Sequence, residues 1–135
     1  MSKASILDVG LAMLTNLEAT HKAGYIFNDL KLDNLMVGYG DKLDNTVSEK
    51  SVFSECSIHL VDFGFATKYK DKKGNHIELG ELPSFRGNII FASRDQMEFK
   101  TTSRRDDLIS MCYILVYLLH RGKLLDIDIT SNLEV

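Results

Sequence analysis

Two short strings decide how this chain is interpreted: Asp29-Leu30-Lys31-Leu32-Asp33-Asn34 and, after an intervening loop, Asp62-Phe63-Gly64. The first string places a carboxylate, an ammonium and an amide within six residues. The second places another carboxylate after the apolar run 58–61. Such groups can orient a hydroxyl and hold Mg²⁺ on a nucleotide, which are the requirements of phosphoryl transfer. No glycine-rich phosphate loop and no strand lysine precede these strings.

The composition is typical of a soluble, globular, intracellular protein. The 135 residues, 44% hydrophobic and 26% charged, are enough for one domain with a modest core. A net charge of −3 argues against a general nucleic-acid or membrane-surface binder. The longest nearly apolar run, 108–119, is too short to span a bilayer. Cys56 and Cys112 lack metal-ligand spacing, so we expect a reducing, cytoplasmic or nuclear location.

The hydrophobic pattern predicts a mainly α-helical fold with a small β-hairpin. A helix is expected over 5–22, where apolar residues recur at helical spacing. Ser5 followed by Asp8 resembles a capping box, and Gly24 is a typical residue after a helix end. The next elements are predicted in chain order as strand 35–37, surface loop 38–55, strand 58–61 able to pair with the first, turn 68–75, an aperiodic stretch 76–91 and a short helix 94–98.

The last predicted helix runs from about Ser103 to His120, with Ser103 or Thr102 as its N-cap. Two aspartates lie in its first turn, where the helix dipole favours negative charge. Over 108–119 nearly every face is apolar, which predicts a buried helix surrounded by protein. Because the fifteen residues after His120 are too few to enclose it, we expect a partner chain to cover 108–119.

Three ordered motifs resemble the large lobe of eukaryotic protein kinases. They are Tyr25-Ile26-Phe27-Asn28-Asp29-Leu30-Lys31-Leu32-Asp33-Asn34, Val61-Asp62-Phe63-Gly64 and Gly87-Asn88-Ile89-Ile90-Phe91-Ala92-Ser93. The run Ser103-Arg104-Arg105-Asp106-Asp107-Leu108, together with Phe91-Ala92-Ser93, is similar to the casein kinase 1 group of serine/threonine kinases. The resemblance covers about residues 5–120. It implies that 1–135 is part of a kinase domain, from the helix before the catalytic loop through the central apolar helix.

The resemblance implies a chemical role for each matching polar residue. Asp29 would orient the substrate hydroxyl and accept its proton, and Lys31 would neutralise charge on the transferred phosphoryl group. Asn34 and Asp62 would supply oxygen ligands to the Mg²⁺ of ATP. A loop-capping aspartate, a solvated loop lysine and a turn-forming asparagine are the alternative interpretations of the first three.

Three further residues would support this site. Phe63 should pack inward, and Gly64 should permit the backbone turn. Asp107 aligns with the helix aspartate that, in kinases, accepts hydrogen bonds from the catalytic-loop backbone, because a buried carboxylate needs such partners. A charge that merely favours the helix N-terminus is the simpler interpretation of Asp107.

A basic side of the chain suggests the substrate. Residues 62–105 hold nine Lys and Arg against six Asp and Glu. Arg104 and Arg105 could bind an anion, since the family favours acidic or already phosphorylated protein substrates. A solvated helix start explains these arginines nearly as well. Asn88 stands where a threonine normally bonds the catalytic aspartate and lysine.

The chain departs from the kinase pattern at three positions around the catalytic aspartate. Phe27 replaces the usual histidine, Asn28 the usual arginine and Leu32 the usual proline. Losing the arginine removes the group that pairs with a phosphate on the activation segment. We therefore expect any activity to be independent of that phosphorylation. None of these changes deletes an essential charge.

The family's nucleotide-covering lobe precedes its catalytic loop, and we expect it to be missing here, together with the helices that wrap the central helix. A nucleotide held only through Mg²⁺ is poorly positioned, so the isolated chain should show little or no turnover. Two hypotheses follow. One is an ATP-dependent serine/threonine kinase; the other is a catalytically idle kinase-like lobe acting as a protein-binding module. A poorly folding remnant is a third.

Overall fold

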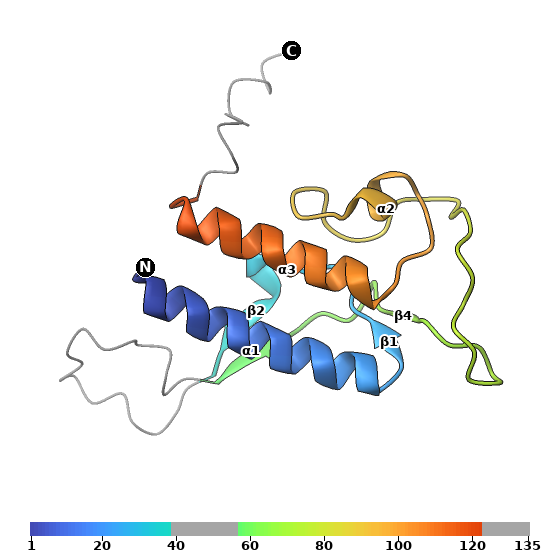
Figure 1. Cartoon of the computed structure of the whole chain (residues 1–135), viewed down its shortest axis with the longest axis horizontal. Helices are drawn as coiled ribbons and strands as arrows, with labels where there is room; N and C mark the ends of the chain where they lie inside the picture. Colours follow the sequence, from blue (N-terminus) through green and yellow to red (C-terminus); the bar gives the residue numbers. More distant parts are fainter. Residues whose placement is uncertain (39–56, 123–135) are drawn as a thin grey trace, which may run out of the picture.

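The structure, a computed structural model, describes residues 1–38 and 57–122. In that part of the chain two long helices, α1 (Lys3–Lys22) and α3 (Arg104–Leu119), accompany a short helix, α2 (Arg94–Met97), and two antiparallel two-stranded sheets. Figure 1 shows α1 and α3 running side by side in opposite directions, with the small sheets beside them. The prediction of a mainly α-helical fold with a small hairpin is confirmed.

Helix α1 begins two residues earlier than predicted because Ser2, rather than Ser5, caps it. The Ser2 hydroxyl accepts a hydrogen bond from the Ser5 N–H at 3.1 Å, so the predicted Ser5–Asp8 capping box is wrong. The helix ends as predicted, before Gly24, whose φ of +92° is a left-handed conformation that glycine adopts without strain. The helix buries a stripe at helical spacing, namely Val9, Met13 and Leu17.

The predicted hairpin strands are present and paired. Strands β2 (Leu35–Val37) and β3 (Ile58–Leu60) run antiparallel with Leu35 opposite Leu60. The second strand ends one residue before the predicted boundary, but the Val61 N–H still donates to the Asn34 carbonyl at 3.0 Å. The predicted surface loop 38–55, apart from Gly38, lies outside the described residues.

A second two-stranded sheet was not predicted. Strands β1 (Tyr25–Ile26) and β4 (Thr67–Lys68) pair antiparallel, where a loop and a turn were expected. A single 3₁₀ turn, η1 (Leu32–Asn34), also lies inside the predicted loop. The turn after β4 is confirmed, since the Asp71 carboxylate accepts two backbone N–H bonds within the next four residues.

Helix α2 begins at the predicted residue, and α3 begins after Ser103, one of its two predicted N-caps. Ser93 and Gln96 form a reciprocal capping box at α2. The N–H and hydroxyl of Ser103 both donate to the Asp106 carboxylate at α3. These helices are one residue shorter than predicted at one or both ends, within the usual uncertainty of helix boundaries.

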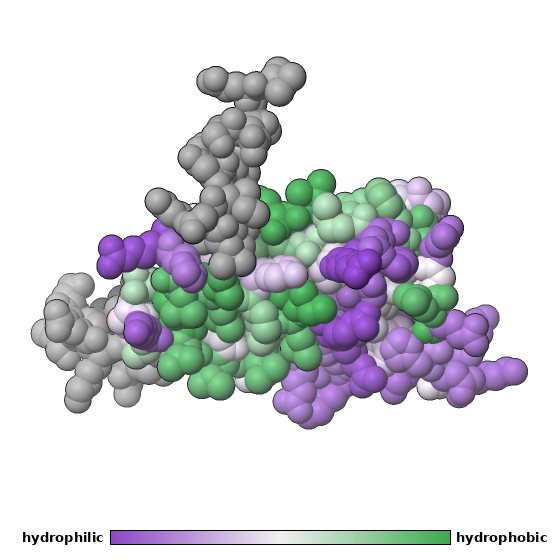
Figure 2. Space-filling model, turned by 45° about the horizontal axis from the view of Figure 1, so that its top comes forward, coloured by the Kyte–Doolittle hydropathy of each residue, from purple (hydrophilic) through white to green (hydrophobic). Residues whose placement is uncertain are grey.

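Helix α3 is buried on one face only within the described residues, so the partner predicted to cover 108–119 stays a prediction. Ile114 is fully buried in the core, whereas Leu108, Cys112 and Leu119 are exposed. The buried face packs on α1 so closely that a Cβ at Gly10 would lie 3.2 Å from the Leu115 side chain. Figure 2 shows hydrophobic side chains gathered over the helix pair. No described helix is long and apolar enough to cross a membrane.

Candidate active site

The loop between β1 and β2 is anchored to helix α3 by one buried carboxylate. Asp107 is 1% exposed, and its two oxygens accept the N–H groups of Phe27 and Asn28, each at 2.8 Å. The His21 Nε2 lies 2.7 Å from the same carboxylate. Because a buried carboxylate is costly without partners, these contacts explain how Asp107 is tolerated and hold the start of the loop in place.

Asp29 follows directly in this loop and contacts two other residues from the first string. Its Oδ2 lies 3.0 Å from the Lys31 ammonium and accepts a hydrogen bond from the Asn34 Nδ2 at 2.9 Å. The same Asn34 nitrogen also donates to the Asp29 backbone carbonyl at 2.9 Å. The amide plane of Asn34 is therefore fixed, with its oxygen directed away from Asp29.

The second oxygen of the Asp29 carboxylate has no partner. Oδ1 is the one buried side-chain polar atom in the described part of the chain that makes no hydrogen bond. Buried polar atoms are nearly always satisfied, so an unsatisfied one calls for an explanation. A carboxylate oxygen is a strong acceptor, and a hydroxyl donor would satisfy it. The site thus has one buried acceptor that no described group satisfies.

Lys31 is held in its charged form by the surrounding carboxylates. Its hydrogen bond with Asp29 is the largest influence that raises its pKa; burial opposes this, while the charges of Asp29, Asp62 and Asp33 add to it. A raised folded-state pKa means that this ammonium stabilises the fold fully below its ordinary pKa and loses the effect as the pH rises above it.

The second string contains the predicted turn, since the Ala66 N–H donates to the Phe63 carbonyl at 3.0 Å across Gly64. Asp62, not Gly64, carries the left-handed backbone, with φ of 63°. A Cβ at Gly64 would lie 3.1 Å from the Asp62 Oδ1 that accepts its N–H, so a larger residue would need a small shift of this exposed side chain. Phe63 does not pack inward in the described residues: it is 50% exposed, and its ring forms a T-shaped pair with Phe27 at 5.0 Å between centroids.

The two predicted metal ligands come from neighbouring strand ends. The Val61 N–H bond to the Asn34 carbonyl places Asp62 beside Asn34 along the backbone. Asp62 is exposed and keeps a carboxylate oxygen that accepts no described hydrogen bond. Within 1–38 and 57–122, no group of three or more His, Cys, Asp or Glu could hold a metal ion by itself. A cation here would need oxygen atoms from a ligand as well.

The three residues predicted to meet substrate are not brought together. Arg104 lies over the Tyr69 ring, 4.7 Å from its centroid, whereas Arg105 pairs with Asp95. Asn88 does not reach Asp29 or Lys31 by any described hydrogen bond. Its side-chain oxygen instead accepts the N–H groups of two residues that follow it in the same turn. An anion-binding role for the two arginines stays a prediction.

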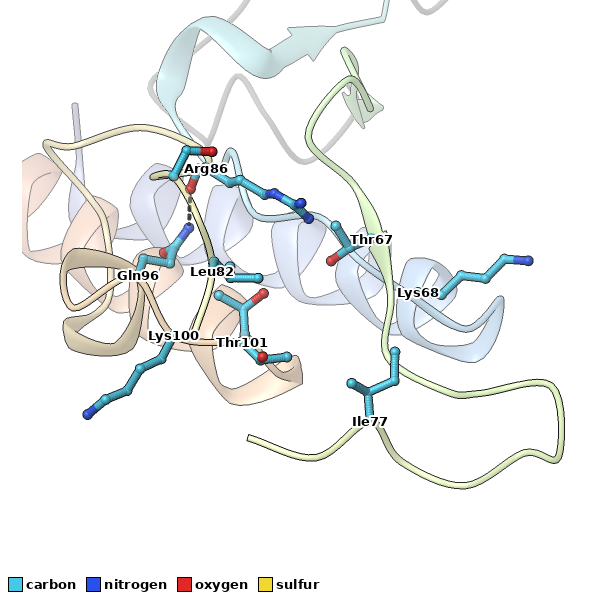
Figure 3. A pocket seen from close by; sticks show the side chains of 10 residues that line it. Thr67, Lys68, Ile77, Leu82, Arg86, Gln96, Lys100 and Thr101 are labelled. Atoms are coloured by element: carbon cyan, nitrogen blue, oxygen red, sulfur yellow. Dashed lines mark hydrogen bonds between the residues drawn. The ribbon is translucent and has the colours of Figure 1, made fainter. Parts of the chain in front are cut away.

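A pocket of about 190 Å³ lies beside the loop and was not predicted. Figure 3 shows the Arg86 side chain reaching toward Thr67, while Lys68 and Lys100 extend away from the pocket. Its remaining walls are Ile77, Leu82, Ser84, Gln96, Thr101 and Thr102. These residues come from separate segments, so no local motif marks the pocket. The excess of basic residues over 62–105 is the one feature of the sequence that points to it.

Known proteins match this chain over nearly its whole length. It is 33% identical over 126 residues to casein kinase 1-like protein HD16 of Oryza sativa subsp. japonica, covering 92% of this chain and 16% of that protein. It is 32% identical to casein kinase I homolog 3 of Schizosaccharomyces pombe and to casein kinase I homolog 2 of Saccharomyces cerevisiae, covering 91% of this chain in both cases. No protein-family model matches.

The class and then the family follow from these matches. The loop, the turn at Asp62 and the start of α3 stand within a segment homologous to protein kinases. The chain belongs to the casein kinase 1 family. It spans 16% to 26% of the length of these curated relatives.

Proposed function

We propose that this chain is part of a serine/threonine protein kinase of casein kinase 1 type, in which residues 1–135 contribute the lobe that holds the catalytic loop. Such an enzyme transfers the γ-phosphate of ATP to hydroxyl groups of protein substrates. The observation that carries the proposal is the Asp29 carboxylate, with Oδ2 fixed by Lys31 and Asn34 and Oδ1 buried without a partner. Family membership supports the same chemistry.

The residues of this chain would act on the substrate hydroxyl as follows. Asp29 would accept a hydrogen bond from the hydroxyl at Oδ1, which orients its oxygen, and take the proton as the new O–P bond forms and the bond between the γ-phosphorus and the departing ADP breaks. Lys31 keeps its charge because of the carboxylates around it and offers that charge to the transferred group. Asn34 holds the Asp29 carboxylate in one orientation, so little rearrangement is needed during the reaction.

The donor set also fits Mg²⁺ and ATP. An amide oxygen of Asn34 and the exposed carboxylate of Asp62 are hard oxygen ligands, and Mg²⁺ is usually held by few protein groups plus phosphates and water. When bound, ATP with Mg²⁺ would supply the phosphoryl group and neutralise its developing charge. The unpaired Asp29 Oδ1 would remain for the hydroxyl.

A protein substrate with acidic or phosphorylated residues suits the basic surface near the loop. Arg86 reaches into the pocket beside the loop, and Arg104 and Arg105 lie at the start of α3. Lys100 is paired with Glu98 and contributes less. A cytoplasmic or nuclear location, as for an intracellular kinase, is part of the proposal.

Binding of ATP with Mg²⁺ should stabilise the chain. At an ATP concentration about five times the dissociation constant, linkage predicts roughly 1 kcal/mol of added stability, visible as a rise in the melting temperature. EDTA should remove the rise, and Asp62→Asn should remove it as well, because that substitution deletes a charged oxygen ligand. Asp33→Asn, an exposed aspartate of the same loop region, is the matched control and should keep it. No rise at millimolar ATP with Mg²⁺ would contradict nucleotide binding by this chain.

A second candidate function is that of a catalytically idle, kinase-like binding module. One surface favours it. Leu7, Leu11 and Leu14 on α1 are 68%, 64% and 45% exposed, and Leu119 on α3 is 51% exposed. Exposed apolar patches of this kind mark interaction surfaces. In this proposal a partner chain covers 108–119 and the leucine stripe of α1.

Gel filtration tests this second candidate. We expect the chain, of 15.2 kDa, to elute as an associated species whose size grows with concentration, since apolar surface is removed from water on association. Replacing Leu7 and Leu11 by Glu should shift it toward the monomer. Replacing the exposed Ala23 at the end of the helix by Glu is the control and should not shift it. A monomer that is stable at all concentrations would argue against the partner.

A further inference from the structure

Asn28, the residue before Asp29, is buried in an unusual conformation. It is 4% exposed and has φ of +67°, in the left-handed region that few residues other than glycine and asparagine adopt. Its N–H donates to Asp107 at 2.8 Å, which fixes its backbone to helix α3. A residue held in this way at the edge of a site is a candidate for a role in positioning.

The side chain of Asn28 joins three separate segments. Its Nδ2 donates to the Phe65 carbonyl at 2.8 Å and to the Thr67 hydroxyl at 2.9 Å, both in the segment that follows Asp62. Its Oδ1 accepts a hydrogen bond from the Thr102 hydroxyl at 2.5 Å, just before α3. The orientation of the amide is therefore determined, because only this orientation satisfies all three partners.

The backbone carbonyl of Asn28 is also held. The Gln96 Nε2 donates to it at 2.8 Å and to the Arg86 carbonyl at 3.1 Å, the second bond being drawn in Figure 3. Gly87 approaches the same carbonyl so closely that a Cβ would lie 2.2 Å from it. Every polar group of Asn28 thus has a partner, and the partners come from four parts of the chain.

We propose that Asn28 is a positioning residue that clamps segment 62–67 to the loop carrying Asp29. One side of the clamp continues directly into Asp29, and the other is three residues from Asp62. A shift of that segment would change the separation of the two carboxylates. The side-chain partners are a carbonyl and two hydroxyls, so the clamp closes without a charged group or an added phosphate. An effect of the clamp on catalysis rests on the proposed kinase function, whereas the hydrogen bonds of the clamp are independent of that function.

Amide hydrogen exchange on the 135-residue chain tests the clamp. Asn28→Asp keeps the size of the side chain and tolerates a left-handed backbone, but it cannot donate to Phe65 or Thr67. We expect exchange at the Ala66 and Tyr69 amides, which are bonded within and just beyond the clamped segment, to accelerate by about tenfold or more. Unchanged exchange at these amides would overturn the proposal.

Asn16→Asp is the matched control. The Asn16 Nδ2 also donates two hydrogen bonds, to the carbonyls of Ala12 and Ile58, but these lie away from the clamp. It should leave Ala66 and Tyr69 within about twofold of the unsubstituted chain. Equal acceleration in both variants would show general loosening and would also overturn the proposal.

A milder pair of variants keeps the test decisive if Asn28→Asp does not fold. Thr102→Val removes only the bond to Oδ1, and Thr101→Val, whose hydroxyl bonds Gly80 instead, is its control. Exchange should accelerate in the first variant alone. In a preparation with kinase activity, Asn28→Asp should lower kcat about tenfold with KM for ATP little changed. Absence of ATP binding would refute the kinase function while leaving the exchange result to decide on the clamp.

Discussion

Asp29→Asn should lower phosphoryl transfer to a serine peptide by about 10²- to 10⁴-fold, the range seen when a general base is removed. The substitution keeps the size of the side chain but replaces the oxygen that would take the hydroxyl proton. Binding of ATP with Mg²⁺ should be nearly unchanged, because Asn34 and Asp62 are retained. The measurement is steady-state phosphorylation beside the thermal shift with nucleotide, in the longest active form of the protein.

Asp33→Asn separates this loss from a general effect of charge. Asp33 is exposed, lies four residues from Asp29 and also raises the pKa of Lys31 through its charge. We expect its replacement to change the rate by less than about threefold, since an exposed charge is screened. Asp29→Asn with the activity of the unsubstituted protein would show that another group receives the proton, and the assignment of Asp29 would be wrong.

Asp107→Ala should destabilise the fold by about 3–5 kcal/mol, the range for loss of one partner from a buried charged network. It leaves the N–H groups of Phe27 and Asn28 buried without an acceptor and removes the partner of His21. Urea unfolding followed by circular dichroism measures the change. A loss below about 1 kcal/mol would mean that the loop does not depend on this carboxylate.

Asp106→Ala is the companion variant for that experiment. Asp106 is the neighbour of Asp107 on α3 and is also buried. It accepts hydrogen bonds from Ser93 and Ser103, not from the loop between β1 and β2. Both variants should lose stability. Only Asp107→Ala should speed exchange at the Phe27 and Asn28 amides, because only there does the loop lose its acceptor.

Elements with local signals were predictable from the sequence. Ser93 with Gln96 forms the capping box at the start of α2, and Ser103 with Asp106 forms the one at the start of α3. Because a capping box joins residues only three positions apart, it is visible in the sequence. At α1 two serines compete for the cap, and the pattern does not show which one is used. Strands β1 and β4 have two residues each, too few to display alternation, so their pairing was missed.

In the candidate site, too, contacts between residues close in the sequence were predictable and contacts between distant residues were not. Asp29, Lys31 and Asn34 lie within six residues, so their contacts depend on local chain geometry that the motif already implies. Arg104 and Arg105 have separate partners because adjacent helical residues point about 100° apart, and those partners, Tyr69 and Asp95, lie far from them in the sequence or on another helix. Inward packing of Phe63 was carried over from the family, and it depends on neighbours that the described residues do not supply.

Asn28 shows what a sequence cannot supply. Its side-chain partners are 37 to 74 positions away along the chain, and none of them is an unusual residue type. The sequence does show that Asn28 stands where the family usually has arginine. The hydrogen bonds that the Asn28 side chain makes depend on the tertiary structure and cannot be read from the sequence.

The packing of α1 against α3 has a consequence for biosynthesis. These are the two long helices of the described residues, and Val9, Met13 and Leu17 share their core with Ile114. During translation Phe27 and Leu30 become available to this core soon after α1, but the part of the α1 surface that packs on Ile114 stays uncovered until about a hundred further residues have left the ribosome. The nascent polypeptide is exposed to chaperones and proteases over that interval, and completion of α3 ends it.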